Sequence, residues 1–362
     1  AYAGGFTGKL NMHKGAISFE NCVVGSEDVA TSITGAERVA AFVAKTLAVD
    51  NTSVIDLTFK NCVNYADVTG AGAAASAVGS LVGRVNRTNV TVDGCVNNGT
   101  ITSESTKNSR GVGGLIGEII YNCNVTITSS TNNGDINVVT AVPGGLIGIT
   151  SYRSYVTIGA LKEVEAAAPA SETAEGGDAA AKTYVVDETK ACVNNGDINQ
   201  ANDWAYGSGG IIGFVKSNSK KDLMTDDSTP NEVRVYGAVN NGNITTALSN
   251  IGGIVGTNSN VSGDRILNCT NSGNIVINTS TQSNKYIFVG GIAGRGYGNT
   301  VATNSGKIDV VQLKCTRLNL GGLIGESNGT ISAGSKNLAE GDITVTGLTI
   351  AGDNIRLGGV AG

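Results

Sequence analysis

Short apolar runs recur along the chain at an almost constant interval, and every run has the same five-residue pattern. Two small residues, two apolar residues and one small residue follow each other, most clearly in residues 113–117, Gly-Gly-Leu-Ile-Gly. Ten copies begin at Gly4, Ala40, Gly79, Gly113, Gly144, Gly209, Gly252, Gly290, Gly321 and Gly358. Successive copies start 31 to 43 residues apart, except for the 65 residues between Gly144 and Gly209. This period is typical of repeat proteins, in which one supersecondary unit stacks on the next.

Between the pentapeptides, β-branched residues alternate with polar ones, as in 90–92 (Val-Thr-Val) and 125–127 (Val-Thr-Ile). This alternation indicates a strand with one buried face. A second phrase, small-x-Asn-Asn/Ser-Gly-x-Ile, occupies residues 95–101, 130–136, 192–198, 238–244, 269–275 and 302–308. Because Asn and Gly adopt positive φ cheaply, the phrase predicts a corner. One unit is therefore expected to contain three strands, and the pentapeptide is expected to be one of them.

Three short strands per unit and almost no helix pattern predict an all-β fold. We expect a right-handed parallel β-helix (β-solenoid) of about nine to ten three-stranded coils with loop or hairpin insertions. Coils spaced by about 4.8 Å would make a rod of about 50 Å. A β-propeller is the alternative, but its blades need four strands and its blade number is usually four to eight. Residues 1–362 are expected to form a single repeat domain, and both ends fall within the repeat, which suggests a piece of a longer protein or ends that pair with another chain.

Equivalent positions of neighbouring coils should lie on top of one another. The small position of the second phrase then forms a column of Cys62, Cys95, Ser130, Cys192, Ala238, Cys269 and Ala302, with Cys22 beside it. We expect these to be buried small side chains, and the sequence leaves the disulfide state of Cys22, Cys62 and Cys95 open. The asparagines form a second column, Asn64, Asn97, Asn132, Asn194, Asn240, Asn271 and Asn304. Stacked asparagines pass hydrogen bonds from coil to coil, so this ladder is expected to be structural.

Insertions interrupt the repeat at two main places. Residues 161–190 form an inserted arm or loop with a low-complexity centre, and residues 216–232 form a charged inserted loop. Insertions on a regular scaffold are where binding residues usually lie.

The pentapeptide followed by an Asn-x-Gly-x-Ile turn resembles the GLUG motif repeat over nearly the whole chain. The copies at residues 40–44 and at Ser80 depart from the motif, because another residue fills a glycine position. GLUG repeats occur in large surface-anchored or secreted proteins, including adhesin-like proteins. The resemblance implies a non-catalytic scaffold at the cell surface.

Charge and composition narrow the chemistry. The net charge of −5 and the lack of a basic stretch interleaved with aromatics argue against nucleic acid. No apolar segment is long enough for a transmembrane helix, so no membrane insertion is expected.

His13 is the only histidine, and it lies in a loop after the first pentapeptide. The densest acidic group is Asp226, Asp227 and Glu232. The simpler interpretation of this acidic group is a solvated loop. Calcium is the one metal that the group would suit, and no other cofactor is expected.

Aromatic side chains that could stack on sugars are Trp204, Tyr206, Tyr152 and Tyr155. The first hypothesis for function is a non-catalytic extracellular surface β-solenoid that acts as a structural stalk, coat or adhesin. Its partners would be copies of itself, or other cell-surface proteins or glycans. One alternative is a self-assembling filament or layer subunit. Another is a carbohydrate-active β-helix enzyme or a glycan-binding module.

Overall fold

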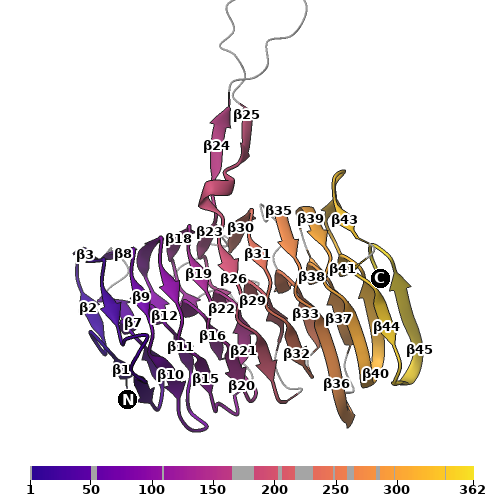
Figure 1. Ribbon diagram of the computed structural model, residues 1–362, viewed down its shortest axis with the longest axis horizontal. Helices are drawn as coiled ribbons and strands as arrows, with labels where there is room; N and C mark the ends of the chain where they lie inside the picture. The colour runs from indigo at the N-terminus through magenta and orange to yellow at the C-terminus, as the bar shows by residue number, and fades with distance from the viewer. Residues whose placement is uncertain are drawn as a thin grey trace, which may run out of the picture.

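The strands stack in parallel as a β-solenoid of about 8 turns, seen in a computed structural model. The structure describes residues 2–49, 55–107, 110–164, 183–202, 206–216, 231–247, 249–258, 265–282, 286–296, 298–338 and 340–362. Its long axis runs from the N-terminal coil to the C-terminal coil (Figure 1). The predicted all-β solenoid is therefore confirmed. The turn number is slightly below the expected nine to ten, because nine stacked strands in one sheet make eight steps.

Three sheets form the walls of the solenoid. Sheet 1 holds two parallel stacks. The first stack is β5 (Ser32–Gly35), β10 (Asp67–Gly70), β15 (Ile101–Ser103), β20 (Ile136–Val138), β27 (Ile198–Gln200), β32 (Ile244–Thr246), β36 (Ile275–Gln282), β40 (Ile308–Gly321) and β44 (Ile343–Val345). The second stack is β1 (Tyr2–Gly4), β6 (Arg38–Ala40), β11 (Ala77–Gly79), β16 (Gly111–Gly113), β21 (Val142–Gly144), β28 (Ser208–Gly209), β33 (Asn250–Gly252), β37 (Tyr286–Gly290), the end of β40, and β45 (Leu348–Gly358).

Sheet 2 follows sheet 1 around each coil. Its strands are β2 (Leu10–Met12), β7 (Val43–Ala48), β12 (Val82–Asn86), β17 (Ile116–Ile120), β22 (Ile147–Ser151), β29 (Ile212–Val215), β34 (Val255–Asn258), β38 (Ala293–Gly296) and β41 (Ile324–Ser327).

Sheet 3 closes each coil with one longer and one two-residue segment. The longer strands are β3 (Gly15–Glu20), β8 (Ile55–Lys60), β13 (Thr88–Asp93), β18 (Asn124–Thr128), β23 (Tyr155–Ile158), β30 (Glu232–Tyr236), β35 (Arg265–Asn271) and β39 (Asn299–Asn304), of which β35 and β39 span both segments. In the last coil this place is taken by the two-residue β42 (Thr330–Ile331). The shorter strands are β4 (Val23–Val24), β9 (Val63–Asn64), β14 (Val96–Asn97), β19 (Thr131–Asn132), β26 (Val193–Asn194), β31 (Val239–Asn240) and β43 (Lys336–Asn337).

The pentapeptide is a corner and not a strand, which corrects the expectation from the sequence. Strand β16 ends at Gly113 and β17 begins at Ile116, so the chain turns from sheet 1 to sheet 2 at Gly114 and Leu115. A Cβ atom on Gly114 would lie under 3.0 Å from the carbonyl oxygen of Gly145 in the next coil. The glycines are therefore required by the close approach of neighbouring backbones at this bend.

Inward-facing β-branched residues fill the interior. In β18 the inward residues Val125 and Ile127 are buried, and the alternate residues point outward. Isoleucines at the start of the first stack of sheet 1 lie directly over one another, in the column Ile101, Ile136, Ile198, Ile244, Ile275 and Ile308. Burying one such side chain contributes about 1.5–3 kcal/mol. The core is thus one continuous apolar cylinder.

Positive φ occurs at a different corner from the one the sequence predicts. The Asn-Asn-Gly glycines such as Gly134 and Gly196 do not have it; a Cβ atom on Gly196 would lie under 3.0 Å from the carbonyl oxygen of Gly134. Positive φ is found instead before the small column, at Asn61, Gly94 and Ser129. Close coil-to-coil contact explains the glycine of the phrase, and a tight turn explains the residue before the small column.

One hairpin leaves the body of the solenoid. Strands β24 (Leu161–Val164) and β25 (Thr183–Val186) pair in antiparallel fashion and rise above sheet 3 (Figure 1). A short 3-10 helix, η1 (Glu188–Lys190), leads back into the coil, and the Asp187 side chain accepts a hydrogen bond from the Thr189 backbone N–H. The centre of the predicted insertion at 161–190 lies outside the described residues.

Candidate ligand-binding groove

The cysteine column is a set of free thiols. All seven cysteines are free, five of them belong to the column, and all but Cys22 are buried. Burial raises the pKa of Cys95 and of Cys269 to about 12, and that of Cys192 to about 11. The Cys62 thiol donates to the Phe19 carbonyl oxygen at 3.2 Å. Protonated, buried thiols are poor nucleophiles and poor metal ligands, so this column has a packing role.

The asparagine column is a continuous hydrogen-bonded ladder. Asn97 Nδ2 donates to Asn132 Oδ1 at 2.7 Å, and the same nitrogen donates to the carbonyl oxygen of Gly99 at 2.8 Å. The other steps, from Asn64 to Asn97 and onward through Asn132, Asn194, Asn240, Asn271, Asn304 and Asn337, measure 2.7–2.9 Å. Sequence reading missed Asn337, because the Gly of its phrase is delayed to Gly341. The amides from Asn64 to Asn304 are buried and that of Asn337 is half-buried, and all are engaged with one another and not open to a ligand.

Only one of the three predicted metal ligands lies in the part of the chain that the structure describes. Asp226 and Asp227 lie outside the described residues. Glu232 begins β30, and its carboxylate accepts a hydrogen bond from Arg234 Nε at 2.6 Å. Within the described ranges, no group of three or more His, Cys, Asp or Glu side chains is placed to hold a metal ion.

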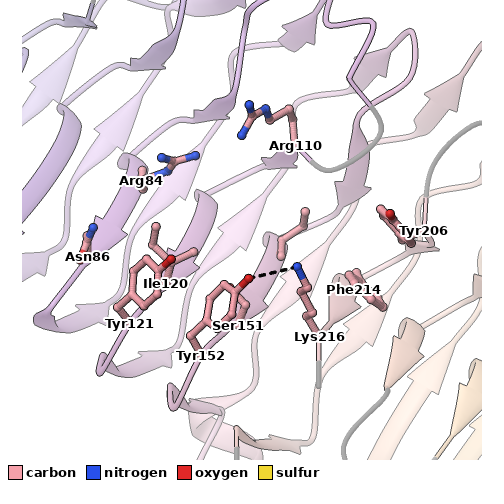
Figure 2. A pocket seen from close by; sticks show the side chains of 11 residues that line it. Arg84, Asn86, Arg110, Ile120, Tyr121, Ser151, Tyr152, Tyr206, Phe214 and Lys216 are labelled. Carbon is pink, nitrogen blue, oxygen red and sulfur yellow. Dashed lines mark hydrogen bonds between the residues drawn. The ribbon is translucent and has the colours of Figure 1, made fainter. Parts of the chain in front are cut away.

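Two of the four aromatic candidates line one groove. Tyr152 and Tyr206 both border a cavity of about 470 Å³ on the outer side of sheet 2. Tyr155 belongs to β23 on sheet 3, where its side chain is exposed, and Trp204 lies outside the described residues. The groove lies over β12, β17, β22 and β29 (Figure 2).

The turn that follows each sheet 2 strand builds one wall. Arg87, Tyr121 and Tyr152 occupy equivalent turns of successive coils, and all three have positive φ. The rings of Tyr121 and Tyr152 stack at 4.8 Å, with 14° between their planes. Beyond them, Lys216 Nζ lies 5.2 Å from the Tyr152 ring centroid and donates to its hydroxyl at 3.2 Å (Figure 2). On the opposite side, the Arg87 guanidinium lies 5.9 Å from the Tyr121 ring centroid.

This stack changes what Tyr152 can offer to a ligand. One face of its ring is covered by Tyr121, and Lys216 donates a hydrogen bond to its hydroxyl at the edge of the groove. A cation over a tyrosine face, as Arg87 is for Tyr121, contributes about 0.5–1 kcal/mol at an exposed site. Tyr152 therefore contributes its hydroxyl to the groove and gives one ring face to the stack with Tyr121.

The opposite wall holds a more accessible ring. Tyr206 stacks on Phe214 at 5.4 Å and remains 47% exposed. Its backbone carbonyl oxygen accepts hydrogen bonds from Asn250 Nδ2 at 2.9 Å and from Thr257 Oγ1 at 3.2 Å. Tyr206 is thus the lining aromatic that is both anchored and open to a ligand.

Arg84, which lines the groove, is held by an ion pair with Glu118 behind the lining. Arg84 Nε donates to Glu118 Oε2 at 2.7 Å, and the Gly111 backbone N–H donates to Glu118 Oε1 at 3.0 Å. Burial raises the pKa of Glu118, against the attraction of Arg84. Because both carboxylate oxygens are engaged, Glu118 holds Arg84 in place at the groove.

Two lining groups keep unused hydrogen-bonding atoms. Asn86 is 9% exposed, and its Oδ1 has no hydrogen-bond partner among the described residues; the same holds for Arg110 Nε. A buried polar atom without a partner is costly, so these atoms indicate a site that a ligand completes.

Sequence reading missed most of the lining, although the repeat contains the signal. The residue directly after each pentapeptide faces outward from sheet 2 in a single column, Lys9, Lys45, Arg84, Glu118, Ile149, Phe214, Thr257, Arg295 and Glu326. Tyr121 and Tyr152 likewise share one offset from their pentapeptides. Comparing these offsets across the copies would have located the groove.

The fold and the groove define the class of protein as a parallel β-solenoid with a polar and aromatic groove on one sheet. No family model matches the chain. A search of curated proteins and a search of solved structures also found no match. None of the helices in the described part of the chain is long and apolar enough to span a membrane.

Proposed function

We propose that this chain is a non-catalytic, extracellular surface β-solenoid that acts as a stalk or coat and binds carbohydrate as an adhesin through the groove on sheet 2. The observation that carries the proposal is the groove itself, in which one open aromatic ring faces tyrosine hydroxyls and unpaired polar atoms. Carbohydrate sites combine these elements, because a sugar has apolar faces and many hydroxyl groups. The resemblance of the repeat to GLUG motif proteins supports a surface location.

The arrangement of acids favours binding over hydrolysis. A glycosidase needs two carboxyl groups that flank the scissile bond. Among the described residues that line the groove there is no carboxylate, and the nearby Glu118 is buried and engaged by Arg84 and Gly111. The rigid ladders inside the coils suit a scaffold that presents a fixed surface.

The test is a binding measurement with a panel of immobilised and soluble oligosaccharides on the full chain. We expect at least one saccharide class to bind, and Tyr206→Ala to weaken that binding roughly fivefold through the lost ring contact. Tyr155→Ala is the matched control, because Tyr155 is also an exposed tyrosine but lies on sheet 3, and it should leave affinity unchanged. A blank panel would contradict the proposal, and release of new reducing ends would favour the enzyme alternative.

A further inference from the structure

We infer that sheet 2 binds an acidic polysaccharide, which lies along the solenoid axis over a cationic stripe that extends from the groove toward the N-terminal coil. The stripe consists of Lys9, Arg38, Lys45, Arg84, Arg87, Arg110 and Lys216. This inference rests on the proposed carbohydrate-binding function and specifies its ligand class.

Positive charge is concentrated on this surface, although the chain as a whole is negatively charged. The stripe has seven cations, and the two carboxylates paired within it are Glu37 and Glu118, a difference of +5. The whole chain carries −5, so the remainder carries −10. A local positive field on an acidic protein attracts and orients an anionic ligand.

The cations lie close enough to repel one another. Lys45 and Arg84 are direct register partners on β7 and β12, and Lys9 precedes β2 at the next position of the same column. Burial lowers the pKa of Lys45, and the charges of Arg38 and Arg84 lower it further. A bound anion would relieve this repulsion, which an isolated cation on a surface does not experience.

The remaining lining groups favour a saccharide over a nucleic acid. The Oδ1 atom of Asn86 is an acceptor, so it needs a ligand O–H or N–H group. Sugar hydroxyls supply that donor, and acidic sugars supply carboxylates or sulfates for the arginines. Single-stranded nucleic acids depend on a series of open aromatic faces, whereas Tyr121 and Tyr152 stack on each other and Tyr206 is the exposed ring of the lining.

Geometry favours an extended ligand. The stripe and groove reach from β2 to β29, which are five steps apart in sheet 2. At about 4.8 Å per step the surface is about 24 Å long. A linear oligosaccharide of several units can contact cations in successive coils, whereas a disaccharide reaches only part of them.

The experiment measures binding of the full chain by calorimetry. The probes are a galacturonate hexamer, its fully methyl-esterified form, a galacturonate dimer, a sulfated hexasaccharide and a single-stranded oligonucleotide. We expect an acidic hexamer to bind roughly tenfold tighter than the neutral ester and the dimer, and the affinity to fall with added salt. The tighter of the carboxylated and sulfated hexamers identifies the anionic group that the stripe prefers.

Two variants and a control localise the effect. Lys45→Gln and Lys216→Gln should each weaken binding of the acidic hexamer about fivefold while leaving the fold intact. Lys60→Gln removes the same charge from an exposed side chain at the end of β8 on sheet 3 and should have no effect. Equal binding of the acid and its ester would overturn this inference but leave the proposed function standing. No binding of any saccharide would overturn both, and tighter binding of the oligonucleotide would overturn the saccharide assignment.

Discussion

Gly145, in the turn from β21 to β22, packs against Asn194 of β26, and a Cβ atom on Gly145 would lie 2.5 Å from Asn194 Cγ. The same relationship holds between Gly210 and Asn240 and between Gly291 and Asn304, where the Cβ atom would again lie under 3.0 Å from the amide. The missing side chain of the second pentapeptide glycine therefore leaves the room that the asparagine amides occupy. Two sequence motifs that are far apart in the chain are parts of one packing unit.

Gly145→Ala is expected to lower the free energy of unfolding by about 3 kcal/mol, because the added methyl group meets both Asn194 and the Gly210 backbone. Urea unfolding followed by circular dichroism checks this value. Gly359→Ala is the matched control, since a Cβ atom at Gly359 meets nothing within 4 Å. Equal midpoints for the two variants would show that the corner is looser than described.

Asn194→Ala is expected to cost about 2–4 kcal/mol, because it leaves Asn132 Nδ2 and Asn240 Oδ1 without their buried partners. The neighbouring Asn195 provides the comparison. It also bonds from coil to coil, donating to Asn133 Oδ1 at 2.8 Å, but it is exposed. Asn195→Ala should therefore cost under about 1 kcal/mol in the same urea titration. A cost as large as that of Asn194→Ala would mean that burial does not decide the strength of the ladder.

Stability should fall at alkaline pH because of the buried thiols. The folded pKa of Cys269 is raised from 9.0 to about 12, so the unfolded chain loses this proton first as the pH rises. The contribution of this thiol to the free energy of unfolding therefore falls between about pH 9 and about pH 12. At pH 10 each fully buried thiol has lowered the free energy of unfolding by about 1.4 kcal/mol relative to neutral pH.

Unfolding free energies at pH 8 and pH 10 measure this dependence. Cys269→Ala should reduce the difference between the two values, because the variant lacks this thiol. Alanine should fit at the position, because Ala238 and Ala302 occupy the same column in the adjacent coils. An unchanged difference in the variant would contradict the assignment of the effect to Cys269.

Thiol accessibility gives a separate test on the native chain. Cys22 is half-buried at the first coil, whereas the other six thiols are buried. Iodoacetamide at mildly alkaline pH should modify Cys22 first, with the other sites at least about 100-fold slower. Peptide mass spectrometry reports each site, and the chain unfolded in guanidinium chloride is the control in which all seven react. Rapid modification of Cys95 in the native chain would show that its coil opens.

The repeat made the fold predictable, because equal offsets in the sequence become columns in a solenoid. This is why residues such as Asn97 and Asn132 could be placed over one another before any coordinates were known. The corner at Gly114 was misassigned because a short apolar run reads the same in a strand and in a bend that is packed on both sides. The bend at Gly114 is set by close contact with the backbone of the next coil. Such contact leaves no local pattern in the sequence.

The groove was only partly predictable. Tyr152 and Tyr206 were singled out as aromatics, but their partners were not, since Lys216 and Phe214 gain meaning only when successive coils are superposed. The direction in which Tyr152 presents its ring also depends on the stack with Tyr121. A list of aromatic residues therefore identifies members of the site but not the chemistry that they present.

The hairpin β24–β25 shows that this fold tolerates an insertion at one corner of a coil. It is inserted between β23 and β26, yet Asn132 Nδ2 reaches Asn194 Oδ1 at 2.8 Å across 62 residues, as closely as Asn97 reaches Asn132 across 35. The asparagine ladder therefore closes equally well with the hairpin inserted at this corner and without it. The corner after Ile158 is thus a ready-made insertion point, where foreign peptides or whole domains could be grafted and displayed without disturbing the rod beneath them.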